Sequence, residues 1–229
     1  MAKQRVLVLY GSESGTCKRI ANTMSNHWKE KQNAKFEIVG VCTGKELIEQ
    51  TSVVEDDANV MHADFTSLKQ KFDVLIVITS SYGDGDPPDN FAPFFLELLN
   101  AADVQSLGGM QHAVFGQGSS VYQGTFQNIP RLTDKLLGEA GSRRFLARHE
   151  TDAAHYADDS QQKRDKDRFR DAVFEALQVL PSTGSPPVCE WREPSAEHEQ
   201  PKTQITHKTP DDLKEFRASG AVTGAIRER

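Results

Sequence analysis

Short apolar runs constrain the fold of this chain more than any other feature of its sequence. Each run is four to six residues long and nearly continuous, which is typical of strands buried on both faces of a parallel sheet. We predict strands at Arg5–Tyr10, Phe36–Val41, Asp73–Thr79 and His112–Phe115, with a weaker fifth strand at Arg143–Ala147.

The segments between these runs have the spacing of amphipathic helices. Their apolar residues recur every three or four positions, which places them on one helical face. Four such faces are Ile20, Met24 and Trp28; Phe91, Phe95, Leu98 and Leu99; Leu132, Leu136 and Ala140; and Phe169, Val173, Ala176, Leu177 and Leu180. The alternation of strands and helices predicts a doubly wound α/β fold, a three-layer sandwich around a five-stranded parallel sheet with right-handed crossovers.

The composition changes at Pro181. The stretch that follows is rich in Pro, Ser, Thr and charged residues, as linkers are. We therefore predict an α/β domain over residues 1–180. Residues 181–229 are predicted to be a linker or tail, or the start of a connection to a further domain.

The overall charge limits the classes of partner. The 229 residues carry a formal net charge of -6, with a sequence pI near 5.7. This argues against nucleic acid or an anionic membrane as the main partner, and it suits docking onto a basic protein face. No apolar stretch approaches the roughly 20 residues that a membrane helix needs.

The cysteines and the N-terminus indicate the compartment. Cys17, Cys42 and Cys189 are odd in number and form no C-x-x-C pair, so we expect neither a disulfide framework nor a metal site. The first residues, Met1–Arg5, enter the first strand directly, and we expect no signal peptide. A cytoplasmic location is predicted.

Three loops follow predicted strands and should meet at one edge of the sheet, where open α/β sheets bind ligands. The first, "GSESGT" (residues 11–16), has hydroxyls and backbone amides at a helix N-terminus, where an anion such as a terminal phosphate is favoured. It contains no basic side chain. A plain turn with an N-cap explains this loop equally well.

The second and third loops each combine glycines with an aromatic ring. "SSYGDGDPPDN" (residues 80–90) carries Tyr82 and "FGQGSSVYQGTF" (residues 115–126) carries Tyr122. Taken singly, each is also explained by a turn with a packing tyrosine. Two rings on neighbouring loops can enclose a planar ring system. Together with the first loop they predict a planar heterocycle with a terminal phosphate, and flavin mononucleotide (FMN) fits that description.

These loops resemble those of the flavodoxin-like FMN domains of diflavin reductases, the family of cytochrome P450 reductase and the self-sufficient P450 fusions. The resemblance covers about residues 5–180 and rests on "YGSESGT", "SYGDGDPPDN", "FGQGSSVY" and "GEAGSRRFLARHETDA". It implies the strand order 2-1-3-4-5. The sequence departs from the family pattern at Gln117–Ser120, where Leu-Gly-Asn/Asp is more usual.

The resemblance also implies which residues contact FMN and what they do. The first loop would hold the phosphate, Tyr82 and Tyr122 would stack on the two faces of the isoalloxazine, and Asp152 would lie near the flavin. No catalytic residue is expected. The implied cofactor-binding residues are Ser12, Glu13, Ser14, Gly15, Thr16, Cys17, Ser80, Ser81, Tyr82, Gly83, Gly85, Gln117, Gly118, Ser119, Tyr122, Phe126 and Asp152.

The function implied by the resemblance is single-electron transfer. Electrons would come from an FAD/NADPH-binding reductase domain, in cis or in trans, and pass to a haem protein or another redox acceptor. The chain after Pro181 is too short for an FAD/NADPH domain, so a complete NADPH-dependent reductase is not expected. The alternatives are a stand-alone flavodoxin carrier, an FMN-dependent quinone reductase, and a non-redox interaction domain of the same fold.

Overall fold

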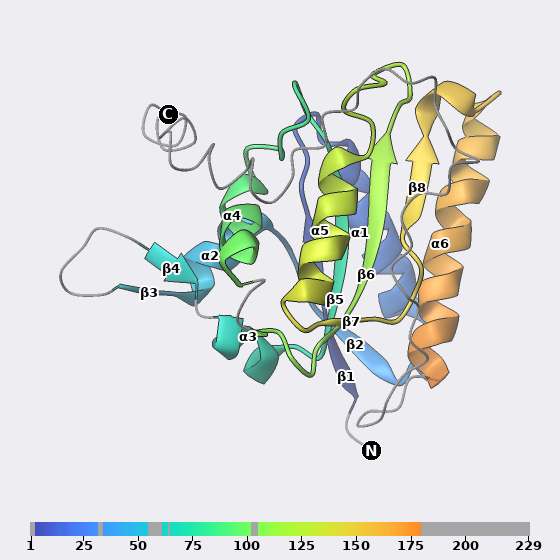
Figure 1. Cartoon of the computed structure of the whole chain (residues 1–229). Coiled ribbons are helices and arrows are strands. Elements are labelled where there is room, and N and C mark those ends of the chain that lie inside the picture. The colour runs from blue at the N-terminus through green and yellow to red at the C-terminus, as the bar shows by residue number, and fades with distance from the viewer. Residues whose placement is uncertain (1–2, 32–33, 55–60, 64, 102–104, 180–229) are drawn as a thin grey trace.

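The computed structural model describes residues 3–31, 34–54, 61–63, 65–101 and 105–179. In this part of the chain a central sheet is covered by helices on both faces (Figure 1). The predicted three-layer α/β sandwich is therefore confirmed. The predicted tail over residues 181–229 lies outside the described residues, so the boundary near residue 180 stays a prediction.

The main sheet is parallel throughout. Its strands follow the order β2 (Phe36–Thr43), β1 (Gln4–Tyr10), β5 (Val74–Ser80), β6 (Gln111–Gly118), with β7 (Arg143–Arg144) and β8 (His149–Asp152) both paired with β6. If the strands of this sheet are renumbered along the chain, β5 becomes the third and β6 the fourth, and β7 and β8 together form the fifth. The order is then 2-1-3-4-5. This is the order that the resemblance implies.

The predicted fifth strand at Arg143–Ala147 is present only at Arg143–Arg144 (β7), and β8 continues its place in the sheet. His112 of β6 pairs with Arg144, and Phe115 pairs with His149. The chain thus advances five residues beside three residues of β6, and the two additional residues interrupt the pairing. The apolar signal at this point comes from Phe145, whose side chain is buried in the core rather than in a continuous strand.

Helices cover the two faces of the sheet in separate groups. On one face lie α1 (Thr16–Glu30) and α6 (Asp159–Val179). The other face is covered by α2 (Gly44–Thr51), α3 (Phe65–Lys71), α4 (Ala92–Ala101) and α5 (Asn128–Glu139) (Figure 1). The connection between β2 and β5 also contains a small antiparallel pair, β3 (Ser52–Val54) and β4 (Met61–Ala63).

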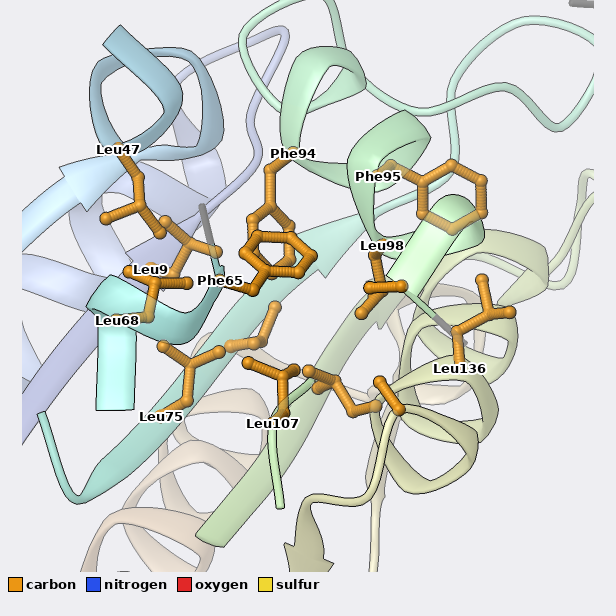
Figure 2. Close-up of a cluster of buried hydrophobic side chains, with 14 of the residues drawn as sticks. Leu9, Leu47, Phe65, Leu68, Leu75, Phe94, Phe95, Leu98, Leu107 and Leu136 are labelled. Carbon is orange, nitrogen blue, oxygen red and sulfur yellow. The ribbon is translucent and has the colours of Figure 1, made fainter. Parts of the chain in front are cut away.

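Each face of the sheet has its own apolar core. Successive side chains of a strand point to opposite faces, so Val6 and Val8 of β1 pack under α1 and α6, while Leu7 and Leu9 pack under the other helices. Figure 2 shows the second core, which contains Leu9 of β1 together with side chains of α2, α3, α4 and α5. Trp28 is buried under α6, as its position on the apolar face of α1 predicts.

Within the described residues, no helix combines the length and the apolar character that crossing a membrane requires.

Candidate functional site

The register of the sheet brings the three predicted loops to one edge. Strands β1, β5, β6 and β8 are parallel, and their carboxyl ends are adjacent: Tyr10 pairs with Ile78, and Gly118 pairs with Asp152. Between them, Ser80 at the end of β5 pairs with Gln117 near the end of β6. The loops that follow these strands therefore start side by side.

The first loop is tied to the second by a two-way hydrogen bond. The Oδ1 atom of Asn90 accepts the backbone N–H of Ser12 at 2.9 Å, and its Nδ2 donates to the Ser12 carbonyl at 3.1 Å. Sequence analysis missed this role, because an Asn at this point has the usual signature of a helix cap. The side chain instead fixes the distance between the two loops.

The hydroxyls of the first loop surround the start of α1. Ser12 Oγ accepts the backbone N–H of Cys17 at 3.2 Å, and Ser14 Oγ lies 3.2 Å from Thr16 Oγ1. Gly15 precedes the helix with φ 83 and, as a glycine, has no side chain to cap the first turn. Apart from the N–H that Ser12 accepts, the positive end of the helix dipole is therefore available to an anion. Glycine permits this left-handed backbone without strain.

Two predicted phosphate residues use their side chains elsewhere. The carboxylate of Glu13 accepts the backbone N–H of Asp89 at 3.2 Å, which adds a second link between the first two loops. The thiol of Cys17 is buried, and burial raises its pKa to about 12. The side chains of Glu13 and Cys17 therefore position the loop and do not lie free to contact the predicted phosphate.

The second loop is a tight turn with Tyr82 at its base. Tyr82 and Asp86 exchange both backbone hydrogen bonds at 2.9 Å, and the Gly85 N–H donates to the Tyr82 carbonyl at 3.0 Å. Gly83 between them has φ 52. The turn holds the Tyr82 side chain 56% exposed. Asn128 Nδ2 donates to the Gly85 carbonyl at 2.8 Å, which anchors the turn to α5.

The serines at the end of β5 have structural partners. Ser81 Oγ accepts the backbone N–H of Ile129 at 3.0 Å, so it supplies a cap to the first turn of α5. Ser80 is half-buried and contacts the thiol of Cys17. Neither hydroxyl therefore points plainly at the predicted ring site.

The third loop carries Tyr122 on two successive turns. The Tyr122 N–H donates to the Ser119 carbonyl at 3.1 Å, and the Thr125 N–H donates to the Tyr122 carbonyl at 3.0 Å. The ring of Tyr122 is 70% exposed. The predicted contact residue Phe126 is half-buried instead, with the Arg131 guanidinium 5.8 Å from its ring centroid. Phe126 thus packs against Arg131 of α5 and helps to hold the loop in place.

A buried amide fixes the third loop against β8. Gln127 Nε2 donates to the carbonyls of Gly116 at 3.1 Å and Thr151 at 2.9 Å. A Cβ atom on Gly116 would lie 1.9 Å from the Gln127 side chain, so only glycine fits there. Gln127 has φ 61, a left-handed backbone without a local sequence signal. Sequence analysis therefore missed it.

Asp152 is the last residue of β8, at the edge of the sheet where the three loops begin. Its carboxylate accepts the backbone N–H groups of Ser120 at 2.9 Å and Ala154 at 3.0 Å, and it contacts the ring of His155. Burial raises the pKa of Asp152, but these hydrogen bonds outweigh burial and hold the pKa below its usual value. The group stays ionised and orders both the third loop and the short 3-10 turn η2 (Ala153–His155).

A buried network of charged side chains joins α5 to the strands β6, β7 and β8 and to the segment between β7 and β8. The Asp134 carboxylate of α5 receives Arg144 Nε at 2.6 Å and Arg148 Nη1 at 2.8 Å, and it lies 3.3 Å from His112 Nε2. Arg148 also reaches Glu150. Burial raises the pKa of Asp134, and the hydrogen bonds from His112 and Arg144 more than offset this, so the pKa is lowered. Burial lowers the pKa of His112.

This geometry agrees with the comparison of the chain with protein families. The family model described as Flavodoxin matches residues 43–166, just over half of the 229 residues. The chain belongs to the flavodoxin family. Membership confirms the predicted cofactor, FMN, and the general role of electron transport.

Relatives of this flavodoxin-family chain include much longer proteins. It is 36% identical over 149 residues to the bifunctional cytochrome P450/NADPH–P450 reductase of Bacillus cereus, covering 65% of this chain and 12% of that protein. It is 30% identical over 177 residues to NADPH–cytochrome P450 reductase of Candida tropicalis, covering 76% and 22%. The chain thus spans less than a quarter of the length of either relative.

Solved structures share the fold. The C101A mutant of flavodoxin from Pseudomonas aeruginosa superimposes with a TM-score of 0.54 at 23% identity, over 76% of this chain and 98% of that one. Oxidised flavodoxin 1 from Bacillus cereus gives a TM-score of 0.53 at 20% identity, over 77% and 99%. At this identity the likeness concerns the flavodoxin fold alone.

The described residues fit the FMN of a flavodoxin. Tyr82 and Tyr122 are the exposed large aromatic side chains in the described part of the chain, and they stand on neighbouring loops. The start of α1, where the N-cap residue Gly15 has no side chain, lies beside the hydroxyls of Ser12, Ser14 and Thr16 and suits a phosphate. The remaining predicted contacts lie at the same edge, while Glu13, Cys17, Ser81 and Phe126 use their side chains to hold the loops.

Proposed function

We propose that this chain is the electron-carrying FMN module of a diflavin system. It would accept electrons from an FAD/NADPH-binding reductase domain, in cis or in trans, and pass them singly to a haem protein or another redox acceptor. The reductases and P450 fusions among its relatives support this choice of partners. Bound FMN would supply the redox chemistry itself.

The observation that carries the proposal is the exposure of Tyr82 and Tyr122 on neighbouring loops. A single exposed apolar side chain is common on protein surfaces, but exposed rings gathered on adjacent loops mark a candidate binding surface. Their loops are held by hydrogen bonds to the scaffold, through Asn128 to Gly85 and through Asp152 to Ser120. The rings are thus presented in a prearranged position, which lowers the entropy cost of binding a planar ligand.

Different groups of residues would bind the phosphate and the ring of FMN. Ser12, Ser14 and Thr16 would donate hydrogen bonds from their hydroxyls to the phosphate. Ser12 Oγ accepts the Cys17 N–H, which leaves its own proton available for this. Backbone groups of Gly83, Gly85, Gln117, Gly118 and Ser119 would line the ring. No side chain in this arrangement transfers a proton to a substrate, so the module would bind and orient its cofactor without a catalytic residue.

Acidic side chains around the edge suit a basic partner face. Asp84 and Asp89 are exposed beside Tyr82, and the formal net charge of the chain is -6. Charges placed like this speed association with an oppositely charged protein and make the rate sensitive to salt. A cytoplasmic location, where such reductases meet NADPH, remains part of this proposal.

An electron-transfer assay tests the proposal. The FMN-loaded chain is mixed with the isolated FAD/NADPH domain of a P450 reductase, NADPH and ferric cytochrome c, and haem reduction is followed by absorbance. We expect haem reduction that needs all components and slows as salt is raised. A chain that binds FMN but never accelerates haem reduction would contradict the proposed partners, and a stand-alone carrier with another donor would then be favoured.

A further inference from the structure

A cavity of about 450 Å³ lies between the start of α6 and the end of β8. Glu150 and Asp152 of β8 form one side, His155 of η2 lies at one end, and residues of α6 from Gln161 to Arg168 form the other side. Sites for small molecules commonly measure roughly 300–1,000 Å³. Apart from Asp152, the lining contains none of the predicted FMN contacts, so this is a second site.

The two carboxylates on the β8 side already have hydrogen-bond donors. Glu150 forms ion pairs with Arg131 at 2.7 Å and with Arg148 at 2.8 Å. Asp152 accepts two backbone N–H groups and contacts the ring of His155. Neither carboxylate therefore needs a donor from a molecule in the cavity.

The carboxylate on the α6 side is engaged in the same way. His149 Nε2 lies 3.1 Å from Asp165 Oδ1, and the Tyr156 hydroxyl donates to Asp165 Oδ2. These bonds connect α6 to β8 and to the residue that follows η2. The acceptor groups of the lining are thus occupied by the protein itself.

The side-chain donors of the lining are, by contrast, left without acceptors. Among the described residues, the guanidinium groups of Arg164 and Arg168 form no hydrogen bond and no ion pair. Gln161 Oε1 accepts the backbone N–H of Ala157 at 2.8 Å, and its Nε2 donates to no group in that part of the chain. A cavity whose acceptors are occupied and whose donors are not suits a molecule rich in acceptor oxygens.

The three donors share one face of α6. Gln161, Arg164 and Arg168 are spaced by three and then four residues, which places them on successive turns. Side chains with this spacing leave the helix about 5–6 Å apart. Each guanidinium can bind two oxygens of one phosphate or carboxylate group. The face is therefore matched to a molecule with two anionic groups at a similar separation.

We propose that this cavity binds a small polyanion, a molecule with at least two phosphate or carboxylate groups, through Arg164 and Arg168. Gln161 supplies a further donor. The enclosed volume favours a small molecule over an acidic protein surface, which needs no cavity. Asp152 borders both this cavity and the predicted flavin edge, so the bound anion lies next to the redox site without belonging to it.

Calorimetric titration of the full chain tests this proposal. Pyrophosphate and citrate serve as the phosphate and carboxylate probes, and sodium chloride of equal ionic strength is the blank. Excess FMN is present throughout, so that the probes do not enter the predicted phosphate loop.

Three variants locate the binding. Arg164→Gln and Arg168→Gln each remove one proposed contact. Lys163→Gln removes the same charge from an exposed position of α6 that does not line the cavity. Circular dichroism and urea unfolding check that the variants fold like the parent protein.

We expect at least one probe to bind the parent protein with a dissociation constant below about 1 mM. Arg164→Gln and Arg168→Gln should each weaken this binding at least about fivefold, because charge-assisted hydrogen bonds are lost. Lys163→Gln should change it less than about twofold. The probe that binds more tightly shows whether the site prefers phosphate or carboxylate groups.

Three results would overturn the inference. One is that neither probe binds at millimolar concentration. Another is binding that both arginine variants leave unchanged, which would place the anion elsewhere. The third is an equal loss in the arginine variants and in Lys163→Gln, which would reduce the effect to general charge attraction. None of these results bears on FMN binding or electron transfer, which are tested separately.

Discussion

The side-chain amide of Asn90 forms two hydrogen bonds with the backbone of a single distant residue, Ser12. It accepts from the Ser12 N–H at 2.9 Å and donates to the Ser12 carbonyl at 3.1 Å. This pair joins the loop after β1 to the loop after β5. The predicted phosphate and ring contacts are therefore held in a fixed relation before any cofactor binds.

Asn90→Ala should remove the two hydrogen bonds that join the loop after β1 to the loop after β5. We expect the free energy of unfolding of the apoprotein to fall by about 1–2 kcal/mol, since two partly buried hydrogen bonds are lost. FMN affinity should fall on the order of tenfold, because the loops must then be ordered on binding. Urea unfolding and FMN titration measure the two effects. An Asn90→Ala protein with unchanged FMN affinity would show that this joint does not preorganise the site.

Tyr82→Ala and Tyr122→Ala should weaken FMN binding without harming the fold. Each ring is expected to contribute about 1 kcal/mol or more to stacking on the flavin. Since both rings are exposed in the apoprotein, its unfolding free energy should change by less than about 0.5 kcal/mol. Tyr→Phe variants at the same positions are the matched controls and should bind normally. Full affinity in both Ala variants would refute the stacking assignment.

Asp134→Asn should destabilise the protein strongly. The change removes the buried negative charge that Arg144 and Arg148 share, and removing one partner of a buried ion pair costs about 3–5 kcal/mol; Arg148 keeps its ion pair with Glu150, so we expect the lower end of this range. Asp167→Asn, which removes a partner of Arg170 at the surface of α6, is the control and should cost less than about 1 kcal/mol. Equal effects of the two changes on urea midpoints would contradict the network's role.

The stability of the protein should fall as the pH drops below the pKa of an unfolded histidine, about 6.5. Burial holds the pKa of His112 below that value in the folded state, so the unfolded state binds more protons in this window. His112 alone contributes a slope of at most about 1.4 kcal/mol per pH unit. His27, whose pKa is also lowered, adds to it.

A His112→Gln variant separates this contribution. Its unfolding free energy should vary less between pH 7 and pH 5 than that of the parent protein, and a His27→Gln variant shows how much of the remaining slope is due to His27. The lowered pKa values of Asp134 and Glu150 act only at more acid pH. An unchanged slope in the His112 variant would show that folding does not lower the pKa of His112.

The sequence predicts the strands well where they are buried on both faces, because such strands are continuous apolar runs. The strands β1, β5 and β6 are apolar on both sides, and their runs are visible without any other information. β8 was missed because its side chains are polar: Glu150 lies in it as a partner of Arg131 and Arg148. A strand stabilised by ion pairs to distant residues has no apolar run to reveal it.

The site was predicted in its loops but not in the contacts between them. Tyr82 and Tyr122 stand out by type and place, and both lie exposed at the expected edge. The bonds of Asn90 to Ser12 and of Gln127 to Thr151 join residues far apart in the chain. Such pairs depend on the assembled sheet, and local sequence patterns carry no information about them.

Retention of FMN by the purified protein tests the central claim most directly. The folded apoprotein is incubated with FMN, desalted, and examined by visible absorbance and flavin fluorescence. We predict that flavin absorbance stays with the protein and that its fluorescence is quenched, because Tyr82 and Tyr122 contact the ring. A protein that is folded by circular dichroism but retains no flavin, and shows no binding at micromolar FMN, would contradict the account.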